Sequence, residues 1–162
     1  MAQTTWGDSV NSKILGLAAA AAVVFGGVAA LAHDVSPTVK PRADFFHEVG
    51  KNMKALRGEL GKPDASVAEV QKYAKAIDAL APKVTTMFPA NSAPGPGVVT
   101  EAKAEAWTKP ADLAKAQDAF VKAAHGLNAA AAKGDLAGIK LAAQGLAETC
   151  KGCHEKFREE KH

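Results

Sequence analysis

The sequence of 162 residues is poor in aromatic residues and has no strong excess of either charge. Aromatic residues make up 6% of the chain and apolar residues 48%, so alanine supplies much of the apolar content and favours closely packed helices. The formal net charge is only +3, and no basic run is interleaved with aromatic residues, so we expect no nucleic-acid partner. No segment alternates apolar and polar residues with the period of a strand. These absences predict an all-α protein.

The first 32 residues contain a long apolar run without charges. It extends from residue 14 to 32 and ends in Ala30-Leu31-Ala32, a small-x-small pattern typical of a signal-peptidase site. The run is also about long enough to cross a bilayer. We therefore predict that residues 1–32 are a cleaved signal peptide, with an inner-membrane anchor at 14–32 as the alternative. Both interpretations place a linker at 33–40 and a domain at 41–162 in the periplasm, and only the second associates the protein with a membrane.

The first half of the domain has the apolar spacing of two amphipathic helices. The first is expected from about Pro41 to Leu60. Ser66 and Glu69 form the pattern of a capping box before the second. Pro82 lies inside the second pattern, so we expect a kink or a tightened last turn there.

The second half of the domain predicts two more helices. A helical piece around 101–107 precedes a segment whose apolar residues are seven apart, Leu113, Phe120 and Leu127. Gly134 is expected to end this helix and Asp135 to cap the next. The last helix carries an apolar seam with steps of three and four: Leu136, Ile139, Ala143, Leu146, Cys150, Cys153 and Phe157. Four such helices with short links predict an antiparallel four-helix bundle, preceded by the N-terminal hydrophobic helix.

The chain has only two cysteines, Cys150 and Cys153, and His154 follows them directly. C-x-x-C-H is the attachment pattern of c-type haem: the two thiols add to the porphyrin vinyl groups and the histidine ligates the iron. At about 100° per residue, the three side chains project from one face of a helix. The motif predicts one covalently bound haem c, with Cys150 and Cys153 as attachment sites and His154 as the axial iron ligand.

Three other uses of these cysteines compete with haem attachment. A thioredoxin-like redox pair follows a strand in a βαβ unit, which the sequence does not contain. A structural zinc ion needs four ligands, and only three candidates are close in sequence. A disulfide between the two cysteines is a further alternative in an oxidising compartment.

Several stretches of the sequence resemble the cytochrome c′ family, four-helix haem proteins whose attachment motif lies near the C-terminus. They are RADFFHEVGKNMKAL, MFPA, TEAKAEAW, AAAKGDLAGIK and CKGCHEKFR. The resemblance extends from Arg42 to Arg158. It implies a monohaem c-type cytochrome of the periplasm that cycles between ferric and ferrous iron, meets redox partner proteins and can form a homodimer.

The resemblance also locates the sixth iron position, four residues after the arginine that Arg42 matches. Phe46 stands there and cannot ligate, which implies five-coordinate, high-spin iron that binds nitric oxide and carbon monoxide. The alternative is a low-spin, periplasmic or membrane-anchored electron carrier in which Met53 or His47 is the sixth ligand. A peroxidase needs a distal acid–base group, and Phe46 supplies none, so we expect no enzyme.

The resemblance also suggests roles for residues outside the motif. Arg42 is expected to pair with a haem propionate, or else to be an exposed arginine near a helix start. Thr100 and Glu101 match contacts to the haem edge, although they also suit a helix start. Arg158 matches a basic residue near the proximal face, or else it is an exposed arginine. Trp107 and Phe157 are expected to pack on the haem or in the core.

Overall fold

The computed structural model of the protein describes residues 36–159. The predicted signal peptide or anchor lies outside these residues, as do residues 33–35 of the predicted linker. The helices of the described part are α1 (Lys40–Leu60), α2 (Val67–Leu80), α3 (Glu105–Thr108), α4 (Pro110–Lys133) and α5 (Leu136–Phe157), with 3-10 turns at Ala81–Thr86 and Ala90–Ser92. No strand occurs between residues 36 and 159, only two isolated bridges. The all-α fold is confirmed.

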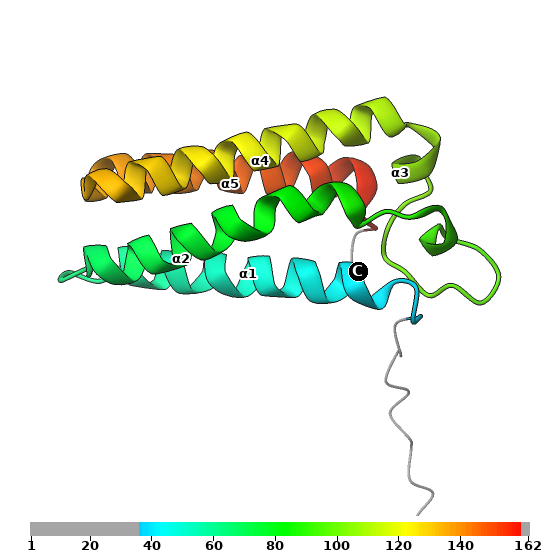
Figure 1. Ribbon diagram of the computed structural model, residues 1–162, viewed down its shortest axis with the longest axis horizontal. Helices are drawn as coiled ribbons and strands as arrows, with labels where there is room; N and C mark the ends of the chain where they lie inside the picture. The colour runs from blue at the N-terminus through cyan, green and yellow to red at the C-terminus, as the bar shows by residue number, and fades with distance from the viewer. Residues whose placement is uncertain (1–35, 160–162) are drawn as a thin grey trace, which may run out of the picture. The chain divides into compact units, whose positions relative to one another are not determined.

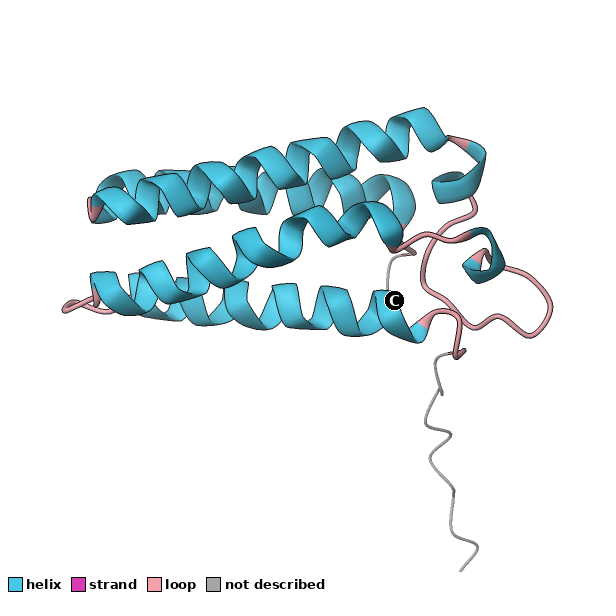
Figure 2. Cartoon of the chain, viewed as in Figure 1, coloured by secondary structure: helices cyan, strands magenta, loops and turns pink. Residues whose placement is uncertain are grey.

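The four long helices form an antiparallel bundle (Figure 1). Helix α1 packs on α2, α2 on α4 and α4 on α5, whereas α1 and α5 contact each other little. The 3-10 turn at 90–92, the short helix α3 and the long loops gather at one end of the bundle, where α5 also ends (Figure 2). The bundle is therefore sparsely packed along the edge between its first and last helices. None of the helices in the described part is long and apolar enough to cross a membrane.

The core confirms the predicted apolar stripes. Each long helix contributes residues with helical spacing, and many of them are alanine, which lets the helices approach closely. They include Val49, Met53, Leu56, Val70, Ala74, Ile77, Phe120, Ala124, Leu127, Ala131, Ile139, Ala143 and Leu146. Full burial of each large side chain among them stabilises the fold by about 1.5–3 kcal/mol.

The helix ends follow local signals in most places. At Pro82 the α-helix stops and a 3-10 helix continues, which is the tightened turn that the proline predicted. Gly134 ends α4 in the left-handed conformation, with φ 76°. Asp135 then caps α5 by accepting hydrogen bonds from the amides of Ala137 and Gly138 at 3.1 and 3.0 Å.

Two local predictions need correction. The helical piece expected at 101–107 begins only at Glu105, because the backbone before it pairs with the end of α5: Lys103 N donates to Phe157 O and Glu159 N to Glu101 O. The capping box at α2 is half present. Ser66 Oγ accepts from Glu69 N at 3.4 Å, but the Ser66 amide donates to Glu59 Oε1 at 2.8 Å. A carboxylate from the end of α1 therefore takes the place of the Glu69 side chain.

Glu59 gives the fold a pH-dependent tie between α1 and α2. Hydrogen bonds from Lys62 Nζ and from the Ser66 amide hold the pKa of the Glu59 carboxyl below its ordinary value. A carboxyl whose pKa is lower in the folded state stabilises the fold above its unfolded pKa, which is about 4.3 for glutamate. That contribution is lost as the pH falls through the folded pKa.

We expect Glu59→Gln to lower the free energy of unfolding at neutral pH. The difference from the parent protein should shrink as the pH falls below about 4, because the parent carboxyl is then protonated as well. Urea unfolding curves recorded from pH 7 to pH 3, pH values chosen to bracket that of about 4, measure both effects. Glu48→Gln is the control, since Glu48 belongs to an exposed pair with Lys51 that contributes little. Equal losses in the two variants at every pH would contradict the prediction.

Candidate haem site

The three residues of the C-x-x-C-H motif lie in the last two turns of α5. Both cysteines are free thiols and partly buried. Cys150 packs against the main core, and Cys153 packs against a second cluster formed by Ala106, Leu113 and Phe157. Burial raises the pKa of both thiols. The two cysteines therefore face the inside of the bundle at the end where the loops gather.

His154 is more exposed than the two cysteines. Partial burial of the imidazole, together with the nearby positive charge of Arg158, lowers the pKa of His154 below its ordinary value. Both influences favour the neutral imidazole, which is the form that ligates a metal. The lowered pKa thus favours the protonation state that an axial iron ligand needs.

Phe46 on α1 lies opposite His154. The two ring centroids are 6.4 Å apart, and the rings are nearly perpendicular. The structure therefore brings together the residue predicted at the sixth position and the residue predicted at the fifth. The two competing candidates lie elsewhere: Met53 is buried in the main core, and His47 is exposed.

Arg42 is buried, with 5% of its surface exposed, so the exposed alternative is wrong. Its guanidinium donates four hydrogen bonds to the loop after α2. Nη1 donates to Met87 O at 3.2 Å and to Ser92 Oγ at 2.7 Å. Nη2 donates to Ser92 O at 3.2 Å and to Thr100 Oγ1 at 2.7 Å. Arg42 and Thr100, two of the predicted site residues, are thus bonded to each other.

The guanidinium of Arg42 also lies against two aromatic rings, Phe88 at 5.0 Å and Trp107 at 5.3 Å from the ring centroids. All four of its hydrogen-bond acceptors are neutral oxygens. Burial lowers the pKa of the guanidinium, but an arginine remains charged in proteins. The site therefore holds a buried positive charge without a carboxylate among its hydrogen-bond partners, and its Nε–H is not used in these four bonds.

Glu101 and Arg158 form a second pair of predicted site residues. Glu101 Oε2 accepts from Arg158 Nε at 3.0 Å and from Nη2 at 2.7 Å. Both side chains are about half exposed, and the neighbouring backbone forms an isolated bridge between Ala102 and Arg158. This pair ties the end of α5, which carries the motif, to the segment before α3.

Sequence reasoning missed two residues of this region. Ser92 is fully buried and serves Arg42 with both its hydroxyl and its carbonyl, yet it lies in a loop rich in proline and glycine that gives no sign of burial. Phe88 contacts Phe46 at 6.3 Å between centroids, and Trp107 at 5.7 Å. In the sequence it stands only within the MFPA stretch of the resemblance, without a role of its own.

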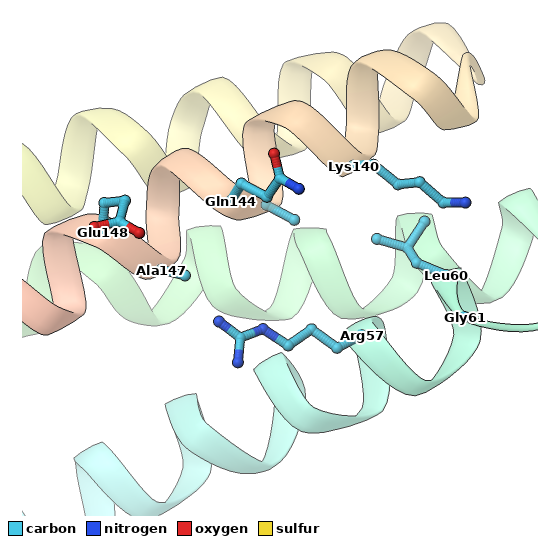
Figure 3. A pocket seen from close by; sticks show the side chains of 8 residues that line it. Arg57, Leu60, Gly61, Lys140, Gln144, Ala147 and Glu148 are labelled. Carbon is cyan, nitrogen blue, oxygen red and sulfur yellow. The ribbon is translucent and has the colours of Figure 1, made fainter.

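The described residues fit a haem group. An open groove of about 430 Å³ lies between α1 and α5, but none of Cys150, Cys153, His154, Phe46 and Arg42 lines it, so it is not the space that these residues enclose (Figure 3). Arg57 extends into it from α1, and Gln144, Ala147 and Glu148 line it from α5. The fit to a haem therefore rests on the side chains of the motif end: two free thiols, an imidazole whose lowered pKa favours its neutral form, and the buried cation Arg42, which suits an anionic group.

The competing uses of the cysteines find less support. The two cysteines are not joined in a disulfide. Among residues 36–159, no group of three or more histidine, cysteine or acidic side chains could hold a metal ion by itself. The motif also lies on a helix that follows another helix, which is not the βαβ setting of a thioredoxin-like pair.

A bundle of four helices with C-x-x-C-H on the last one defines a c-type cytochrome, and comparisons with known proteins give its family. The family model of cytochrome c′ matches residues 37–158. A cytochrome c′ from Pararhodospirillum photometricum is 41% identical over 126 residues, which cover 75% of this chain and 95% of that protein. The chain belongs to the cytochrome c′ family.

Two solved structures are similar in fold. One is a cytochrome c′ described by its ligand-controlled dimer dissociation, with a TM-score of 0.69 and 28% identity over 76% of this chain and 95% of that chain. The other is a nitric oxide complex of a cytochrome c prime variant from Alcaligenes xylosoxidans, with a TM-score of 0.67 and 25% identity over 76% and 94%. As a member of this family, the chain is a haem-binding c-type cytochrome with one covalently attached haem c.

Proposed function

We propose that the protein is a monohaem cytochrome with five-coordinate, high-spin iron that binds nitric oxide and carbon monoxide. The observation that carries the proposal is the position of Phe46, whose ring lies opposite His154 at 6.4 Å. A phenyl ring has no atom that can ligate iron, and it offers no hydrogen bond to a bound ligand. When bound, the haem supplies a one-electron couple and a position for a gas molecule.

The side chains of the site would have different roles around the haem. Cys150 and Cys153 would hold it through thioethers on α5, and His154 would ligate the iron from the same helix. Phe46 crowds the opposite face from α1 and keeps it apolar. The buried charge of Arg42 would favour an anionic group such as a propionate. Glu101 and Arg158 fix the end of α5 beside the motif.

The comparisons support this function in two respects. The Alcaligenes xylosoxidans relative was solved as a nitric oxide complex. A further relative is described by ligand-controlled dimer dissociation, which supports a homodimer here as well. We also propose a periplasmic location after removal of residues 1–32, or attachment to the inner membrane if they are retained. The apolar distal side has no acid–base group at Phe46, so we propose no enzymatic activity.

A second candidate function is one-electron transfer to redox partner proteins. The position of the motif favours it, because the last two turns of α5 lie at one end of the bundle, where a partner can approach. The two functions are compatible in one protein. A low-spin carrier with Met53 or His47 as sixth ligand is the competing form of this second function.

Absorption spectra of the purified holoprotein test the proposal directly. We expect ferric and ferrous spectra of high-spin, five-coordinate iron that change when nitric oxide is added, because Phe46 leaves the sixth position open. A low-spin ferrous spectrum with sharp α and β bands and no response to the gas would contradict it. Replacement of Met53 and of His47 by alanine would then show which of them ligates the iron.

A further inference from the structure

We propose that Phe88 is the positioning residue for Phe46, and that it sets the rate at which a gas molecule reaches the distal side. Phe88 follows the second helix and its 3-10 extension, 42 residues (88 − 46) from Phe46 in sequence. The centroids of the two rings are 6.3 Å apart, with an interplanar angle of 63°. The inference rests on the proposed function for its gas-binding aspect only.

The surroundings of Phe46 leave it few directions in which to move. His154 lies on one side at 6.4 Å, and Phe45 is in edge contact at 4.9 Å. Phe45 belongs to the same helix and moves with it. Apart from His154 itself, Phe88 is the ring contact of Phe46 in the described residues that comes from a separate segment, so it is placed to oppose a rotation of the Phe46 ring away from His154.

Phe88 itself is held firmly by its neighbours. Its ring lies under the guanidinium of Arg42 at 5.0 Å and in edge contact with Trp107 at 5.7 Å. The backbone is fixed on both sides of it. Met87 O accepts from Arg42 Nη1 at 3.2 Å, and Pro89 O accepts from Trp107 Nε1 at 3.1 Å.

In this arrangement the buried guanidinium of Arg42 also holds the Phe88 segment in place. A charge among neutral acceptors is costly to bury, but it pins a loop and an aromatic ring at the same time. Arg42 fixes Phe88, Phe88 opposes the movement of Phe46, and Phe46 covers the face opposite His154. A smaller side chain at 88 removes the obstacle without touching either the motif or Phe46.

We expect Phe88→Leu to raise the association rate of carbon monoxide with the ferrous holoprotein by about fivefold or more, which is close to 1 kcal/mol of barrier. Phe46→Ala is the positive control and should raise the rate at least as much. Phe120→Leu is the matched control: Phe120 is a buried phenylalanine of the main core, and its variant should leave the rate within about twofold of the parent. An unchanged rate in Phe88→Leu, or an equal increase in Phe120→Leu, would overturn the inference.

A second measurement keeps the inference testable if the parent protein binds no gas. Aromatic NMR of holoprotein with ring-labelled phenylalanine reports how fast the Phe46 ring flips. The flip should be faster in Phe88→Leu than in the parent and in Phe120→Leu. A parent that does not bind carbon monoxide contradicts the proposed function, whereas an unchanged Phe46 flip contradicts the role of Phe88.

Discussion

Replacement of Cys150 and Cys153 together by alanine should abolish covalent haem attachment. No other cysteine exists in the chain, so no thioether can form in the double variant. Haem staining of the protein after denaturing electrophoresis measures this all-or-none effect. Each single variant keeps one attachment point and should retain part of the stain. The double variant should also be less stable, because a group bound only by the folded chain stabilises the fold and is then lost.

A neighbouring substitution separates loss of the thiols from damage to the helix. Thr149→Ala changes the residue beside Cys150 and removes a hydroxyl that donates to Leu146 O at 2.7 Å. It leaves both thiols in place and should keep the full haem stain. Haem that survives denaturation in the double cysteine variant would contradict attachment through α5. Loss of stain in Thr149→Ala would show that the test reports the helix rather than the thiols.

The helices could be predicted from sequence because their signals are local. The apolar stripes repeat within one or two turns, Pro82 acts on its own turn, and Asp135 bonds to amides two and three residues away. The motif is local too, since Cys150, Cys153 and His154 fall within five residues (150–154). The resemblance to a family then supplied Phe46, which the structure places opposite His154.

What the sequence did not reveal depends on partners far away in the chain. Arg42 bonds to acceptors 45, 50 and 58 residues away, so nothing near it indicated that it would be buried. The segment before α3 lost its helical turn because it pairs with the end of α5, and the side chains of Glu101 and Arg158 are separated by 57 residues. Glu59 replaced Glu69 at the cap of α2 for the same reason. Each of these contacts exists only once the bundle has assembled.

Among the substitutions of charged residues proposed for this protein, Arg42→Ala should lower the free energy of unfolding the most. The variant loses four hydrogen bonds from a charged donor, and it leaves the buried hydroxyl and carbonyl of Ser92 without that partner. Hydrogen bonds of this kind contribute about 1.5–3 kcal/mol, and a buried group left without a partner costs about 1–3 kcal/mol. We expect a loss of about 3 kcal/mol or more in the free energy of unfolding, measured by urea unfolding of the holoprotein.

Lys54→Ala is the control, because it removes a positive charge from the same helix at an exposed position that lines neither the groove nor the motif end. Its effect should stay within about 0.5 kcal/mol. A loss below about 1 kcal/mol in Arg42→Ala would show that water or a rearranged loop replaces the four bonds, and that the loop does not depend on them.

Arg42→Lys distinguishes the hydrogen-bonding role of Arg42 from the role of its charge. A lysine keeps the positive charge but has one ammonium group in place of the planar fork, so it cannot serve Met87, Ser92 and Thr100 together. We expect stability to fall in both variants. The reduction potential of the haem should fall only in Arg42→Ala, because a buried positive charge near the iron favours the reduced, less positive state. Potentiometric titration of the parent and the two variants measures this. Equal potentials in all three proteins would place the charge too far from the haem to pair with a propionate, and Arg42 would then act only as the clamp of the loop that carries Phe88.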